Sequence, residues 1–116
     1  MATKKKAAKP ARQRRFSRSS LIAEATTTSR LANVTINFFN GIGQVTASLF
    51  RKGILINMQS IATDGIIQFN DVQSGDTMSI NGICTNRASL TISLPTHPAT
   101  PDDFSKGAIV RGYLFL

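Results

Sequence analysis

Apolar and polar residues alternate with a period of two along most of the chain after Leu31, and this alternation limits the fold more than any other feature. Successive side chains of a β-strand point to opposite faces, so the alternation indicates strands with one buried and one exposed face. About seven such runs follow one another at the spacing of roughly 8–12 residues that is typical of sandwiches. The runs are residues 34–38, 44–49, 54–59, 67–69, 78–84, 90–94 and 109–116.

Glycine-containing turn sequences separate these runs, and glycine adopts the positive φ that tight hairpin turns require. The gaps are too short for the crossover helices of a parallel sheet. Only residues 95–106, which contain three prolines, form a long irregular stretch. We therefore predict one all-β domain over residues 31–116, a single antiparallel sandwich of about seven strands. The turn sequences are Asn40-Gly41, Lys52-Gly53, Asp64-Gly65, Ser74-Gly75-Asp76 and Asn81-Gly82.

The larger apolar residues of the alternating runs are predicted to form the core between the two sheets. The final residues, 112–116, are almost entirely apolar, which indicates that the last strand is inner or paired. As an exposed edge it would instead invite pairing with a second molecule, so homo-oligomerisation through that edge is an alternative. The predicted core residues are Phe38, Val45, Leu49, Ile56, Phe69, Ile80, Leu90, Ile92 and Tyr113.

The net charge of +8 is concentrated in residues 1–18, which we call the basic arm. The arm contains no Asp or Glu, and it has almost no large apolar side chain to bury, so we expect residues 1–30 to form a mostly disordered arm and connector. One helical turn over residues 20–25 is the only element that we expect there. The basic residues of the arm are Lys4, Lys5, Lys6, Lys9, Arg12, Arg14, Arg15 and Arg18.

A block of like charge attracts polyanions, and these eight residues are the candidate nucleic-acid-binding residues. Lys and Arg contacts to phosphates supply affinity without reading the base sequence. Two alternatives stay open. The arm could bind another polyanion, such as anionic lipid headgroups, acidic polysaccharide or an acidic protein. It could also serve only as a solubilising or targeting tail. The rest of the chain balances six basic residues against six acidic ones.

The sequence lacks the motifs of an enzyme, a cofactor site or a metal site. Cys84 is the single cysteine, so no intramolecular disulfide forms, and we expect it to be a small core residue. His97 is the single histidine and is expected to be solvated, with no Gly-x-Ser-x-Gly sequence to provide a nucleophile. A hydrolase or lyase would need His97 to meet Asp102 or Asp103 and a Ser or Thr hydroxyl. We expect those two carboxylates to cap a short turn at Phe104 instead.

Three further aspartates, Asp64, Asp71 and Asp76, lie in predicted turns at the ends of strands. Two of them could share one edge of the sandwich and bind Ca²⁺ through oxygen ligands. No Asp-x-Asp-x-Asp series supports that site, so structural roles in the turns are the favoured interpretation. We predict no small-molecule substrate, no cofactor and no metal.

The sequence also bears on location. No apolar run approaches the eighteen residues that a membrane span needs. The basic start is not followed by the apolar segment of a secretory signal. We therefore predict a cytoplasmic protein, with nuclear or organellar targeting by the arm as the alternative.

One stretch resembles a known family. In order, it contains GQVTA (43–47), KGILI (52–56), TDGIIQFNDV (63–72), SGDTMSI (74–80) and LTIS (90–93). This order is similar to that of the prealbumin-like (transthyretin-like) sandwiches, in particular the carboxypeptidase-regulatory-like and Cna-B-like domains. The resemblance implies that Asp64-Gly65 makes a tight turn and that Phe69 enters the core. The chain departs from the family at Met78, where Tyr is common, and the basic arm has no counterpart.

Domains of that family are non-catalytic modules used in adhesion, in assembly or as appendages of enzymes, so the resemblance implies an interaction or structural protein and transfers no catalytic residue. A basic arm before a β-sandwich also looks like the plan of small icosahedral virus coat proteins, whose arms neutralise RNA. That likeness is one of plan and implies assembly into a larger structure.

Overall fold

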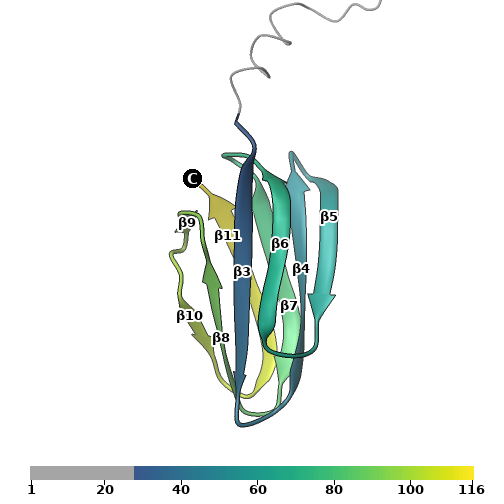
Figure 1. Ribbon diagram of the computed structural model, residues 1–116, viewed down its shortest axis with the longest axis vertical. Helices are drawn as coiled ribbons and strands as arrows, with labels where there is room; N and C mark the ends of the chain where they lie inside the picture. Colours follow the sequence, from purple (N-terminus) through teal and green to yellow (C-terminus); the bar gives the residue numbers. More distant parts are fainter. Residues whose placement is uncertain (1–27) are drawn as a thin grey trace, which may run out of the picture.

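The computed structural model describes residues 28–116, which form two antiparallel β-sheets packed face to face (Figure 1). The basic arm and the helical turn predicted over residues 20–25 lie outside the described residues. The strands are β3 (Arg30–Phe39), β4 (Gly43–Arg51), β5 (Ile54–Ile61), β6 (Gly65–Val72), β7 (Thr77–Cys84), β8 (Arg87–Ile92), β9 (Thr96–His97), β10 (Asp102–Phe104) and β11 (Gly107–Phe115). Across residues 28–116 there is no helix with the length and hydropathy needed to cross a membrane.

One sheet has four strands in the order β10-β8-β3-β6, and the other has five in the order β5-β4-β7-β11-β9. The prediction of an all-β antiparallel sandwich is confirmed. The stretch over residues 95–106 is less irregular than predicted, because it contains the short strands β9 and β10. Asp102 and Asp103 accordingly belong to β10 and do not cap a turn at Phe104, since their backbone pairs with Leu90 and Ser89 of β8.

The core lies between the two sheets and is made by alternate residues of both, as the period of two predicts. Eight of the nine predicted core residues are buried, and Ile56 is the exception, with 41% of its surface exposed. Ile56 lies in β5, the outermost strand of the five-stranded sheet, where the backbone register shifts opposite Leu49 and Phe50. That bulge breaks the alternation, and the opposite sheet does not cover this part of β5.

Four of the five predicted turn sequences lie at turns, and Asn81-Gly82 does not, because both residues lie inside β7. The glycine has a different role there. A Cβ atom at Gly82 would come within 2.0 Å of the carbonyl oxygen of Gln44 on the neighbouring strand β4. Gly82 therefore allows the backbones of β4 and β7 to approach closely.

The strand ends fall at two ends of the sandwich, and we call the end from which β3 starts the arm pole (Figure 1). β3 begins here, and its Arg30 pairs with Val72 at the end of β6. β4 also ends here, since Phe50 pairs with Thr77 at the start of β7. The backbone NH of Gly75 donates to the carbonyl of Phe115 over 2.8 Å, which brings the end of β11 to the same pole.

The last strand is paired along its length with β7, and its C-terminal end, the most apolar part, is paired on both sides. β11 pairs with β7 from Gly107 to Leu114, and with β9 at Leu114 and Phe115. No described strand covers the outer edge of residues 107–113 of β11, so the alternative that this edge recruits a second molecule stays a prediction.

Candidate nucleic-acid interface

The arm pole carries basic side chains that belong to the sandwich itself. Arg30 starts β3, and the exposed Lys52 lies in the turn between β4 and β5. Lys52 and Gly53 both have positive φ, at 53° and 80°, which is typical of the tight turns that join hairpin strands. The turn thus places a lysine ammonium at the same end of the molecule as the start of β3.

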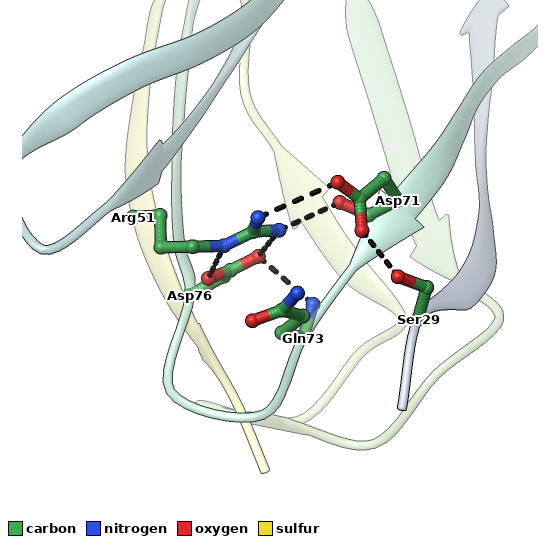
Figure 2. A network of polar contacts seen from close by, with 5 residues as sticks. All are labelled: Ser29, Arg51, Asp71, Gln73 and Asp76. Atoms are coloured by element: carbon green, nitrogen blue, oxygen red, sulfur yellow. Dashed lines mark hydrogen bonds and ion pairs between the residues drawn. The ribbon is translucent and has the colours of Figure 1, made fainter. Parts of the chain in front are cut away.

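Arg51 occupies the centre of the arm pole and makes most of its polar contacts there (Figure 2). Its Nε donates to Oδ1 of Asp76 over 3.0 Å, and its Nη2 donates to Oδ2 over 2.9 Å. The same Nη2 donates to the carbonyl of Asp71 over 2.9 Å, and Nη1 lies 3.4 Å from Oδ2 of that residue. The hydrogen bond with Asp76 raises the pKa of Arg51 above its ordinary value, so the guanidinium stays charged.

Asp76 is the buried carboxylate of this cluster, with only 2% of its surface exposed. Besides Arg51, its Oδ2 accepts a hydrogen bond of 2.9 Å from the backbone NH of Gln73. A buried charge without partners is costly, and here both oxygens of the carboxylate have partners. Arg51 therefore ties the end of β4 to the turn that precedes β7.

The cluster continues to the residue at which the connector meets the sandwich (Figure 2). The Ser29 hydroxyl donates to Oδ1 of Asp71. This hydrogen bond, followed by those from Arg51, holds the pKa of Asp71 below its ordinary value. Asp71 is at the end of β6 in one sheet and Arg51 at the end of β4 in the other, so the contacts join both sheets at the base of the arm.

The cluster has consequences for what the arm pole can bind. Asp71 and Asp76 do lie at one edge of the sandwich, as the Ca²⁺ alternative required, but the Arg51 guanidinium stands between them and forms an ion pair with each. Asp64 is at the opposite pole, where its Oδ1 accepts from the NH of Phe38 over 2.7 Å. No group of three potential metal-ligating side chains occurs within residues 28–116.

Ion pairs also occupy arginines away from the arm pole. Arg87 lies 3.7 Å from Asp103 and stacks over the ring of Phe39, and Arg111 lies 3.0 Å from Asp102. With Arg51 paired to Asp76, three of the six basic residues of the described sandwich have acidic partners. The other three are Arg30, Lys52 and Lys106, which form no ion pair with another residue of the described range.

His97 and the two adjacent aspartates do not come together. His97 lines a shallow depression of about 370 Å³ above Gly112, together with Phe50, Leu114 and the hydroxyl-bearing Thr77 and Ser79. The depression has the histidine and hydroxyls that a hydrolase would need, but the structure shows no carboxylate among its lining residues.

Asp102 instead faces the inner side of β11. Its Oδ2 accepts from the hydroxyl of Tyr113 over 2.7 Å and from Nε of Arg111 over 3.0 Å. Burial, and then the hydrogen bond to Asp102, raises the pKa of Tyr113 above its ordinary value. The hydrolase alternative paired Asp102 with His97, but in the structure Asp102 binds side chains of β11 and so holds β10 against that strand.

Cys84 is buried, with its Sγ 3.3 Å from the carbonyl of Ser105, which confirms it as a small core residue. Sequence reasoning missed the ion pair of Arg51 with Asp76, whose positions are 25 residues apart. The sequence signals for this pair are an isolated arginine at the end of a predicted strand and an aspartate in a predicted turn. The eight candidate nucleic-acid-binding residues of the arm lie outside the described residues.

Comparisons of the chain with protein-family models, with curated proteins and with solved structures found no match. The resemblance to prealbumin-like sandwiches therefore stays a prediction.

Proposed function

We propose that this protein is a non-catalytic module that binds nucleic acid, without sequence specificity, through its basic arm. The observation that carries the proposal is the segregation of charge. The arm holds eight basic residues and no acidic one. The described sandwich holds six basic and five acidic residues, and three of its arginines are in ion pairs.

Nucleic acid suits this arrangement because its phosphates present a regular series of negative charges. Each Lys or Arg that meets a phosphate releases condensed counterions, which supplies affinity regardless of base sequence. Eighteen residues span at most about 60 Å, so the arm can contact many phosphates while the sandwich stays beside the duplex. Arg30 and Lys52 at the arm pole would add to the contact.

The test is a salt titration of binding to duplex DNA, to RNA and to anionic vesicles in parallel. If all eight basic residues meet phosphates on duplex DNA, log affinity falls against log salt with a slope of about −7. The matched control keeps the length of the chain and replaces the eight Lys and Arg residues of the arm with Gln. We expect the control to lose binding and to keep the unfolding midpoint of the original chain.

Each outcome of the titration separates the proposal from an alternative. Tighter binding to anionic vesicles than to either nucleic acid would move the protein to a membrane surface. Absence of binding to all three would leave the arm as a solubilising or targeting tail. Binding that survives the Gln replacements would place the function in the sandwich.

A further inference from the structure

Three long stretches have no described neighbour on their outer side, namely β6, residues 107–113 of β11 and β5, and β5 is the least protected of them. It pairs only with β4, over Val45–Arg51 of that strand, and has no neighbour on its other side among the described strands. Its eight residues include no charged side chain and no proline. Four large apolar side chains are exposed on it: Ile54 (68%), Leu55 (49%), Ile56 (41%) and Met58 (58%). Soluble proteins avoid such an edge unless it pairs with another strand.

The other edges of the sandwich are protected. On β6, Nε2 of Gln59 donates to the carbonyl of Gln68 over 2.7 Å and so occupies part of the edge. β10 has three residues and carries Asp102 and Asp103. β9 has two residues, and prolines flank it. Beyond β9, the edge of β11 presents Arg111, which is paired with Asp102. Short strands, prolines and charges are the usual means of preventing edge pairing, and β5 has none of them.

The surface next to β5 is also uncharged. On the face of the five-stranded sheet that points away from the core, the register places only neutral side chains, and the described residues of this face include no Lys, Arg, Asp or Glu. They include Met58 and Ser60 on β5, Thr46 and Ser48 on β4, Ser79 and Asn81 on β7, and Val110 and Leu114 on β11.

We propose that β5 pairs antiparallel with β5 of a second copy of this chain, which joins the two five-stranded sheets into one sheet of ten strands. Two identical antiparallel edges provide equal numbers of backbone donors and acceptors to each other. Because the edge carries no charge, it does not favour a charged partner of either sign. The bulge at Ile56 leaves residues 57–61 as the regular part of the strand, so the two-fold axis passes near Gln59.

The antiparallel arrangement also separates the arms. β5 starts at the arm pole, so the partner's β5 starts at the opposite end of the sandwich. A strand of nine residues, such as β4, is about 30 Å long. That length, three or more Debye lengths at physiological salt, separates the points at which the two chains enter their sandwiches.

One strand pair buries less area than a standard interface, so the dimer is expected to be weak, with a dissociation constant on the order of 10–100 µM. The proposal does not depend on nucleic-acid binding. The full chain, freed of nucleic acid, is therefore studied at about 0.5 M salt, where the arm's charges are screened.

The experiment is sedimentation equilibrium over a range of chain concentrations, together with hydrogen exchange of the β5 amides. We expect a monomer–dimer equilibrium, and protection of the β5 amides that increases with concentration. Met58→Lys should weaken the dimer at least tenfold, because the two copies of residue 58 become like charges at diagonal positions on one face of the paired strands. The matched control is Val110→Lys, which adds the same charge to another exposed apolar site, on β11 (70% exposed, against 58% for Met58), and should leave the dimer unchanged.

Three results would overturn the proposal. A monomer at all concentrations with unprotected β5 amides means that the edge does not pair with a second copy. Protection that does not depend on concentration means that another segment of the same chain covers β5. A dimer that Met58→Lys and Val110→Lys affect equally is formed by another surface. In both variants, an unchanged unfolding midpoint shows that the sandwich is intact.

Discussion

The guanidinium of Arg51 lies side-on against the carboxylate of Asp76, with Nε 3.0 Å from Oδ1 and Nη2 2.9 Å from Oδ2 (Figure 2). Two parallel charge-assisted hydrogen bonds of this kind fix both side chains in one geometry. The pair stands at the arm pole, where Arg51 also contacts Asp71 of the other sheet. One arginine thus holds together the strand ends next to which the chain enters the sandwich.

Replacing Arg51 with Met should lower the free energy of unfolding by about 3 kcal/mol, because it leaves the buried carboxylate of Asp76 without its charged partner. Urea unfolding at neutral pH measures the change. The control is Arg87→Met, which removes an exposed ion pair of 3.7 Å and should cost about 1 kcal/mol or less. Equal losses in the two variants would show that burial of Asp76 does not set the cost.

Stability should fall in acid partly through Asp71. The pKa of Asp71 in the folded chain lies below its ordinary value of 3.8, first because of the hydrogen bond from Ser29 and then because of Arg51. The folded state therefore binds the proton less well than the unfolded state. The contribution is complete above pH 3.8 and is lost as pH falls through the lowered pKa.

Titration of the Asp71 carboxyl by NMR checks this directly. Ser29→Ala should bring the pKa of Asp71 back toward its ordinary value, whereas the distant Ser89→Ala should not. A pKa that stays low in Ser29→Ala would mean that Arg51 alone lowers it.

The hydroxyl of Tyr113 should resist ionisation. Burial and the hydrogen bond to Asp102 raise its pKa, so the neutral phenol is favoured in the folded state. The stability that this provides is present below the unfolded-state pKa of about 10 and is lost as pH rises beyond it. Tyr113 is the only tyrosine, so phenolate absorbance reports on it alone. We expect the phenolate signal to appear only when the circular dichroism signal of the sheet is lost.

Gly82→Ala should be strongly destabilising, by about 3 kcal/mol, because its methyl group would overlap the Gln44 carbonyl and push β4 and β7 apart. Gly112→Ala is the matched control on β11, where the nearest atom to a Cβ is 4.0 Å away. It should be neutral or slightly stabilising. Thermal unfolding of both variants decides the point, and similar melting temperatures would contradict the role given to Gly82.

The sandwich could be predicted because alternation is a local property that every strand of a two-sheet core must show. Val34, Ile36 and Phe38 alternate with polar residues in β3, and all three are buried. β5 could not be placed in this way. Ile54, Leu55 and Ile56 are as apolar as core residues, and only the sheet order shows that their strand is outermost and uncovered.

The contacts of the arm pole depend on topology in the same manner. Arg51 at the end of β4 meets Asp76 in the turn before β7, and Ser29 before β3 meets Asp71 at the end of β6, and no spacing along the sequence predicts these contacts. Asn81-Gly82 shows the opposite difficulty. Its composition is typical of a turn, but the close approach of β4 is what requires a glycine there. The charge of the arm and the near-neutral balance of the rest of the chain are both visible in the sequence alone.

The position of β3 has a mechanical consequence. β3 is an inner strand, paired with β6 on one side and β8 on the other. A pull on the chain at residue 28, directed along β3, loads both ladders in shear, so many backbone hydrogen bonds share the force at once. The same pull applied to β10, which pairs only with β8 over three residues, would peel its bonds apart one after another. Tension transmitted through the N-terminal side of the sandwich therefore meets a strand that is held on both sides.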